Sequence, residues 1–232
     1  MQLFAHRGVS DLAPENTMQA FALALEQKAC GIELDVRLMS SKVVVMHDAT
    51  VDRTTDGSGL VSEFTAQQWQ ALDAGDGAPP PYLKDVLALV DGRCNINIEL
   101  KSNDLVNQIA SDIDYALKHY KFSLDQFCVS AFDHRLLKAL QALMPKLEIA
   151  PLISACPISL AAFAQDMGAQ ALHSYTETTD IQLINDAKAR NLTIRTYTVK
   201  DAADLVRLQK LGVDAVFVND INWAKKRLKR PV

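Results

Sequence analysis

Segments typical of β-strands alternate with amphipathic helical segments along the whole of this 232-residue chain, and this alternation constrains the fold more than any other feature. Repeated strand–helix units predict a mainly parallel sheet, because parallel neighbours need a crossover between them. The segments that read as strands of this repeat are residues 2–6, 32–36, 95–100, 127–132, 148–153, 170–174, 193–199 and 215–218. The helices expected between them are residues 17–28, 104–118, 134–144, 159–167, 180–189 and 201–211.

One strand-like segment, residues 43–47, does not fit the repeat. Too few residues separate it from the strand at 32–36 for a crossover helix, so it is expected to be the returning arm of a β-hairpin. Residues 49–81 contain no further repeat unit and are rich in Gly and Pro. We interpret them as a small insertion over the C-terminal ends of the strands, with one short helix near 65–72.

Without the hairpin arm, eight strands remain, each followed by a helix, which is the pattern of a (β/α)8 TIM barrel. The alternative is a doubly wound open sheet. However, neither GxGxxG nor GxxxxGK[ST] follows any early strand, although these motifs mark the nucleotide-binding members of that class. The sequence therefore predicts a single α/β domain over residues 1–232, folded as a TIM barrel.

Composition excludes several classes of partner. The chain has 24 Lys and Arg against 28 Asp and Glu, a net charge of −4, whereas a dedicated nucleic-acid binder needs a basic face. No apolar run approaches the ~18–20 residues of a membrane span. The start MQLFAHRG lacks a signal-peptide core, so we expect a cytoplasmic protein without stable membrane insertion. The isolated cysteines Cys30, Cys94, Cys128 and Cys156 are expected to be reduced and buried.

Carboxylates interrupt two strand segments that should line the barrel interior. Glu33 and Asp35 lie in IELDV, and Glu99 lies in NINIEL. Since catalytic groups of a TIM barrel come from the C-terminal ends of its strands, these three side chains are expected to converge. Convergent carboxylates repel one another unless a cation joins them, and oxygen ligands favour Mg²⁺ or Ca²⁺ over zinc. The alternative is a purely structural buried network.

Basic residues are expected at the same end of the barrel. His6 and Arg7 end the first strand, His47 ends the hairpin arm, and Lys101 follows the third strand. A guanidinium can bind phosphate through two hydrogen bonds, and a lysine adds a point charge. Two histidines can serve as general base and general acid near neutral pH. Together with a metal, these groups predict cleavage of a phosphate ester.

Several motifs, in order along nearly the whole chain, resemble those of the glycerophosphodiester phosphodiesterase family. They are HRGVSDLAPENT, GIELDVRL, VVVMHDATVDRTTDGSG, PYLKDVLALV, INIELK, TYTVKD and GVDAVFVND. The resemblance implies a (β/α)8 barrel that hydrolyses small-molecule glycerophosphodiesters to glycerol 3-phosphate and an alcohol, using a divalent metal.

The resemblance also implies roles for individual residues. His6 and His47 match the catalytic pair of the family. Its metal ligands are matched by Glu33, Asp35 and Glu99.

The remaining matches concern the substrate and the support of the site. Arg7 and Lys101 match the groups that hold phosphate. Glu15 and Asn16 belong to the PENT motif and are expected to support the site or to start a helix. Tyr197 stands where the family usually has Trp, so an aromatic substrate-binding surface is retained.

Several alternatives stay open at this point. We expect His6 to be the base and His47 the acid, while the nucleophile is either water or the glycerol hydroxyl of the substrate. Rival functions are phospholipase-D-like cleavage of lysophospholipids and a non-catalytic barrel that binds metal and phosphate. A sugar-phosphate isomerase is disfavoured because VKDAAD and VNDINW lack a phosphate-binding glycine pair. The sequence leaves the choice of alcohol, the choice between Mg²⁺ and Ca²⁺, and the oligomeric state undecided.

Overall fold

A computed structural model describes residues 1–228. Its strands are β1 (Gln2–His6), β2 (Gly31–Met39), β3 (Lys42–Val45), β4 (Asn95–Leu100), β5 (Phe127–Ala131), β6 (Glu148–Ile153), β7 (Ala171–Tyr175), β8 (Thr193–Val199) and β9 (Ala215–Val218). Its α-helices are α1 (Met18–Glu26), α2 (Ala66–Gln70), α3 (Leu83–Val90), α4 (Val106–His119), α5 (His134–Leu143), α6 (Ala162–Asp166), α7 (Ile181–Ala189), α8 (Ala202–Leu211) and α9 (Ile221–Leu228).

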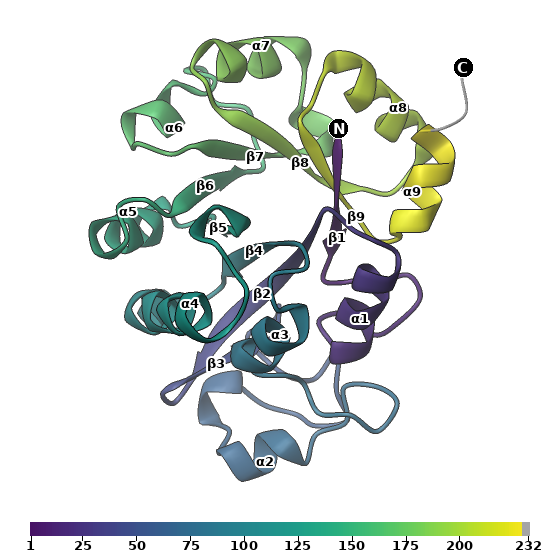
Figure 1. Ribbon diagram of the computed structural model, residues 1–232, viewed down its shortest axis with the longest axis vertical. Coiled ribbons are helices and arrows are strands. Elements are labelled where there is room, and N and C mark those ends of the chain that lie inside the picture. The colour runs from purple at the N-terminus through teal and green to yellow at the C-terminus, as the bar shows by residue number, and fades with distance from the viewer. Residues whose placement is uncertain (229–232) are drawn as a thin grey trace.

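The strands form a closed barrel. Their order is β1-β9-β8-β7-β6-β5-β4-β2-β3, and an additional pairing of β1 with β2 closes the sheet. Every pair in the barrel is parallel, and only β2 and β3 pair antiparallel. Most helices form a ring outside the strands (Figure 1). The predicted (β/α)8 TIM barrel is therefore confirmed, and the open doubly wound sheet is wrong.

The helices cover the barrel through regularly spaced apolar residues. In α3, Leu83, Val86, Leu87 and Val90 follow the spacing of one helical face, and all four are buried in the main core. At the start of α1, the hydroxyl of Thr17 accepts a hydrogen bond from the backbone of Ala20, which satisfies a free N–H at the helix N-terminus.

The two faces of β2 have different environments. Ile32 and Leu34 belong to the core cluster that packs under the helices. Glu33 and Asp35 alternate with them, so they face the barrel interior, and both are buried. The same alternation in β4 places Glu99 on the interior face, beside β2. Polar groups therefore take interior positions that usually hold branched apolar side chains.

The hairpin and the insertion pack together at one side of the barrel. The insertion, with α2, lies beyond β3 and away from α8 and α9 (Figure 1). Its core contains Trp69, which is fully buried and packs with residues of the hairpin. The indole N–H of Trp69 donates to the carbonyl of Pro80 at 2.8 Å. This separate cluster gives the insertion its own packing against the hairpin.

Two local expectations differ from the structure. All four cysteines are free thiols, but only Cys94 and Cys128 are buried, whereas Cys30 and Cys156 lie exposed in connecting segments. The expectation that all four are buried is wrong, because an apolar neighbourhood in sequence does not place a loop residue inside. Helix α6 begins three residues later than expected, because the preceding turn includes Leu160 with φ of 50°.

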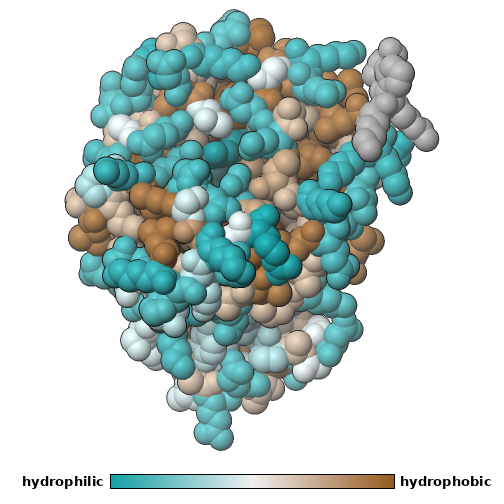
Figure 2. All heavy atoms as spheres, viewed as in Figure 1, coloured by the Kyte–Doolittle hydropathy of each residue, from teal (hydrophilic) through white to brown (hydrophobic). Residues whose placement is uncertain are grey.

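Hydrophilic side chains lie across the whole face seen in Figure 2, with hydrophobic ones showing between them. Within the described part of the chain, no helix combines the length and apolar character needed to cross a membrane.

Candidate active site

Three carboxylates meet inside the C-terminal mouth of the barrel. Glu33 and Asp35 come from β2, and Glu99 comes from the neighbouring β4. One oxygen from each lies within 4.8 Å of the others. The expected convergence of these residues is therefore seen, and the oxygen atoms are spaced so that one cation could contact all three.

The cluster is electrostatically costly without a cation. Burial, together with the neighbouring carboxylates of Asp35 and Glu99, raises the pKa of Glu33 well above its usual range. Burial and then Asp35 raise the pKa of Glu99 to about 7. Burial also acts on Asp35, but Lys101 and Arg7 outweigh it and lower its pKa. A proton or a cation must therefore accompany the three carboxylates near neutral pH.

The turn after β1 supports this cluster through its backbone. Arg7 has φ of 56° and Gly8 has φ of 79°. A Cβ at Gly8 would lie 2.6 Å from backbone and side-chain atoms of Ala20, so only glycine fits there. This turn directs the N–H of Arg7 to Oε2 of Glu33 at 2.8 Å. The sequence His-Arg-Gly is thus needed for its backbone shape as well as for its side chains.

The PENT segment holds the second carboxylate. The side-chain amide of Asn16 donates to Oδ2 of Asp35 at 3.0 Å, and the N–H of Asp35 donates to Oδ1 of Asn16 at 3.4 Å. The backbone N–H of Asn16 donates to the carbonyl of Arg7 at 3.0 Å. Asn16 therefore ties β2 to the turn after β1, while the neighbouring Thr17 begins α1.

Two cationic side chains lie against the carboxylates. Nε of Arg7 is 3.1 Å from Oδ2 of Asp35, and its Nη1 donates to Glu15 at 2.8 Å. Nζ of Lys101 is 3.3 Å from Oδ1 of Asp35 and also contacts Glu99. Both cations line the pocket described below, so they are available to an anionic ligand that enters it.

His6 is held as a neutral imidazole. Its Nδ1 is 3.0 Å from Oδ1 of Asn219, whose amide nitrogen donates to Asp11 at 3.1 Å. The amide oxygen therefore faces His6, and Nδ1 carries the hydrogen. Nε2 is left as the acceptor, 3.4 Å from the hydroxyl of Thr198. Burial and the charge of Arg7 lower the pKa of His6 to about 4, so its Nε2 is unprotonated near neutral pH.

His47 has a charged partner instead. Its Nδ1 lies 2.6 Å from Oδ1 of Asp48, and Nε of Arg53 donates to the other oxygen of Asp48 at 2.6 Å. Arg53 also pairs with Glu15 at 2.7 Å. The hydrogen bond from Arg53 keeps the pKa of Asp48 low, so Asp48 stays ionised. Burial lowers the pKa of His47, and the carboxylates of Asp35 and Asp48 offset this shift only in part.

A pocket of about 580 Å³ joins these groups. Its lining residues are His6, Arg7, Ser10, Glu15, His47, Glu99, Lys101, Phe132, Tyr175, Thr176, Glu177, Tyr197, Thr198, Lys200, Asp201, Asp204 and Asn219. The insertion, in the part of the chain described, contributes none of them, but its Arg53 donates hydrogen bonds to Asp48 and Glu15 beside the pocket. The pocket mouth is therefore left open rather than capped.

One wall of the pocket is aromatic. The ring of Tyr197 lies 6.1 Å from those of Phe132 and Tyr175, centroid to centroid. The hydroxyl of Tyr197 donates to the carbonyl of Ile153 at 3.0 Å, which fixes the ring. Tyr175 in turn donates to Glu177 at 3.2 Å. The aromatic surface expected from Tyr197 is thus part of a larger wall with a carboxylate at its edge.

Sequence reasoning missed three partners of the site. Asp48 was visible as the residue after His47, and the pairing of a histidine with an adjacent carboxylate was the signal. Arg53 and Asn219 gave no local signal, because their contacts depend on how the insertion folds back and on how β9 lies beside β1.

Comparison with known proteins agrees with this geometry. The model of the glycerophosphoryl diester phosphodiesterase family matches residues 6–223. A glycerophosphodiester phosphodiesterase of Caldanaerobacter subterraneus is 35% identical over 97% of this chain and 98% of its own length. One of Bacillus altitudinis is 33% identical over 94% of each chain. A phosphodiesterase of Oleispira antarctica, solved with the product sn-glycerol-3-phosphate, has a TM-score of 0.91, 27% identity, and coverage of 99% and 97%.

The fold and the site therefore define a barrel enzyme built for an anionic substrate. The chain belongs to the glycerophosphoryl diester phosphodiesterase family and is a phosphoric diester hydrolase.

Proposed function

We propose that the protein hydrolyses small glycerophosphodiesters to glycerol 3-phosphate and an alcohol, by general acid–base catalysis beside a divalent cation. The observation that carries this proposal is that two histidines line one pocket and have hydrogen-bond partners of different charge. His6 has a neutral amide partner, and His47 has a carboxylate partner. The product found in the Oleispira antarctica phosphodiesterase supports the same substrate class.

The carboxylate cluster fits a hard divalent cation, Mg²⁺ or Ca²⁺. Oε1 of Glu33 is buried without a hydrogen-bond partner among the described residues, and one carboxylate oxygen of Glu33 lies within 4.8 Å of oxygens of Asp35 and Glu99. A cation would relieve the mutual repulsion that raises the pKa values of Glu33 and Glu99. Bound there, it would supply neutralisation of negative charge on the phosphate as the transition state forms.

The phosphate would be held by Arg7 and Lys101. Each of these residues pairs with Asp35 from a different side. With part of the charge of Asp35 neutralised by a cation held by the three carboxylates, the guanidinium of Arg7 and the ammonium of Lys101 would be free to bind phosphate oxygens. Arg7 is already oriented by Glu15, so its guanidinium loses little conformational entropy when it binds phosphate.

His6 would act as the general base and His47 as the general acid. His6 presents an unprotonated Nε2 and removes a proton from the nucleophile, which is either water or the glycerol hydroxyl of the substrate. His47, whose imidazolium form is favoured by its pairing with Asp48, would when protonated donate its Nε2 proton to the departing alkoxide. After the reaction the two histidines exchange protons with water and return to their starting states.

The alcohol would rest on the aromatic wall of Phe132, Tyr175 and Tyr197. The wall lines the pocket with Glu177 beside it, so it would accommodate a small polar alcohol. A lysophospholipid would need an apolar groove for its acyl chain, whereas the lining of this pocket is dominated by charged and hydroxyl side chains. The free diester is therefore the preferred substrate.

The test is direct hydrolysis by the purified protein. Glycerophosphocholine, glycerophosphoethanolamine and glycerophosphoglycerol are each incubated with the protein, with and without chelator, and glycerol 3-phosphate is measured. We expect release of glycerol 3-phosphate that stops on chelation. Choline release from lysophosphatidylcholine without action on the free diesters would support the phospholipase-D-like alternative instead. If the protein bound metal but turned over none of these substrates, the result would support the alternative of a non-catalytic barrel that binds metal and phosphate.

A further inference from the structure

A small cavity adjoins the main pocket beside the carboxylate cluster and shares His6, Glu99 and Tyr197 with the lining of that pocket. Its volume is about 20 Å³, and about 10–15 Å³ is enough to hold one water molecule. The residues that line it are His6, Glu33, Asn97, Glu99, Leu152, His173, Tyr197 and Phe217. Four of them, Glu33, Asn97, Glu99 and His173, each have a buried polar side-chain atom without a hydrogen-bond partner in the described chain. The atom of Glu99, Oε1, is ion-paired with Lys101, so the atoms of Glu33, Asn97 and His173 are the ones left for the cavity. Because such atoms are rare in native proteins, their gathering around one cavity calls for an occupant.

The unpartnered atom of His173 is a donor. Nη1 of Arg195 lies 3.2 Å from Nε2 of His173, and a guanidinium can only donate. Nε2 must therefore accept, and the hydrogen of the neutral ring is on Nδ1, which is the atom without a partner. Full burial and the charge of Arg195 lower the pKa of His173 far below its usual range, so the ring stays neutral.

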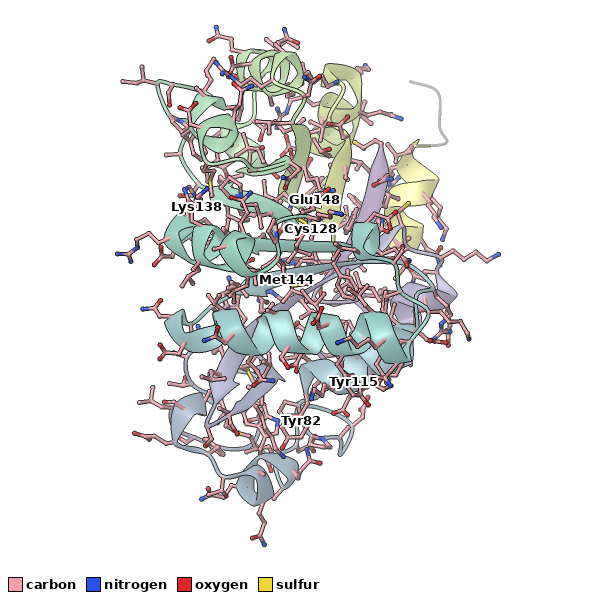
Figure 3. All side chains as sticks on the ribbon, turned by 60° about the vertical axis from the view of Figure 1, so that its left-hand side comes forward. Tyr82, Tyr115, Cys128, Lys138, Met144 and Glu148 are labelled. Carbon is pink, nitrogen blue, oxygen red and sulfur yellow. The ribbon has the colours of Figure 1, made fainter. Side chains whose placement is uncertain are left out.

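Arg195 cannot turn away from this ring. Its Nη1 also donates to Glu148 at 2.6 Å and lies 3.5 Å from Sγ of Cys128. Cys128 and Glu148 are register partners on β5 and β6 and lie side by side in Figure 3. The guanidinium carbon is 5.6 Å from the centre of the Phe4 ring. The tautomer of His173 is thus determined by a fixed, ion-paired arginine.

The other two unpartnered atoms are acceptors. The amide nitrogen of Asn97 donates to the hydroxyl of Ser130 at 3.0 Å, so the amide oxygen is the atom left for the cavity. In Glu33, Oε2 already accepts from the backbone of Arg7, and Oε1 is left. One donor and two acceptors are the complement of a single water molecule, which accepts one hydrogen bond and donates two.

We propose that one ordered water occupies this cavity, accepting from Nδ1 of His173 and donating to Oδ1 of Asn97 and Oε1 of Glu33. His173 and Asn97 are then positioning residues for the Glu33 carboxylate. Oε1 of Glu33 has two lone pairs, so it can accept from the water and still ligate a cation. The water prevents the carboxylate from rotating down into the cavity and keeps Oε1 directed at the cluster of three carboxylates. Nothing in the water assignment depends on the proposed function, whereas its effect on metal binding does.

The first test is a near-atomic-resolution crystal structure of the metal-free protein and two variants. His173→Asn keeps an N–H near the position of Nδ1, and His173→Leu keeps much of the volume without a donor. We expect the water in the wild type and in His173→Asn, and its loss in His173→Leu. A dry cavity in the wild type, or an unchanged water in His173→Leu, would overturn the proposal.

The second test measures Mg²⁺ and Ca²⁺ affinity by calorimetry, which needs no diester. His173→Leu should weaken the affinity by about tenfold or more, as outer partners of metal ligands commonly do, while His173→Asn should stay close to the wild type. At saturating metal, KM for the diester should be unchanged in both variants. A merely structural histidine would lower the melting temperature equally in both variants and leave the affinity of each unchanged, and that result would remove its positioning role. If the wild type bound no metal, the proposed function would fail, and the crystal structure would still decide the water.

Discussion

Replacing Asp48 with asparagine should remove the acid function of His47 while leaving its imidazole in place. Nε of Arg53 donates to Oδ2 of Asp48 at 2.6 Å, and Nδ1 of His47 lies 2.6 Å from Oδ1. In the Asp48→Asn variant, the amide oxygen must face Arg53, because a guanidinium only donates. The amide NH₂ then faces His47, and Nδ1 must accept. The ring becomes a neutral imidazole that carries its hydrogen on Nε2, which is a much weaker acid than the imidazolium.

The size of the effect follows from this exchange of tautomers. The loss of turnover should approach that of removing the acid itself, roughly 10²–10⁴-fold. The hydrogen bond from Asp48 raises the pKa of His47, so the variant has a lower pKa. The acid must be protonated to act, so turnover falls as the pH rises above the pKa of His47. This fall should occur at a lower pH in the variant than in the wild type.

The assay compares two leaving groups. The leaving group of a choline diester is an alkoxide, which needs a proton. The leaving group of a nitrophenyl diester is a stable phenolate, which does not. Asp48→Asn should therefore lose turnover on the choline diester and keep most of it on the nitrophenyl diester. Glu63→Gln removes a carboxylate at an exposed position of the nearby insertion and serves as the matched control. Equal losses on both substrates, or wild-type turnover on the choline diester, would refute the assignment of His47 as the acid.

Four further outcomes are expected. His6→Ala should reduce turnover roughly 10²–10⁴-fold on both substrates, because a base is needed whatever the leaving group; sparing of the nitrophenyl diester would contradict this role. Chelation and dialysis should abolish turnover, Mg²⁺ or Ca²⁺ should restore it, and Glu33→Gln should weaken metal binding in calorimetry with little change in melting temperature. Metal uptake should release protons near neutral pH, because burial raises the pKa of Glu99 to about 7; affinity should then fall as pH falls, and the heat should depend on the buffer. Trp69→Ala should lower the free energy of unfolding by about 3–5 kcal/mol in urea titrations, since a fully buried indole and its hydrogen bond to Pro80 are lost.

The sequence by itself was sufficient for the barrel and for much of the site. The periodicity of a strand or helix depends only on which of its faces is buried. The local alternation of apolar and polar residues shows that face, as Ile32 and Leu34 do around Glu33 and Asp35. The short link before β3 excluded a crossover on length alone. Charged residues at the ends of consecutive parallel strands could be brought together by topology without any coordinates, because all these ends meet at one mouth.

The tertiary structure alone decided which hydrogen-bond and ion-pair partners the site residues have. The partner of His6 is Asn219, 213 positions away, and it arrives only because β9 closes the barrel against β1. Arg53 reaches Asp48 and Glu15 because the insertion folds back on its own core. His173 faces Arg195 through the register of β7 with β8. Such contacts join groups that are distant in sequence, and their geometry is set by strand register and side-chain packing, which no local pattern of residues encodes.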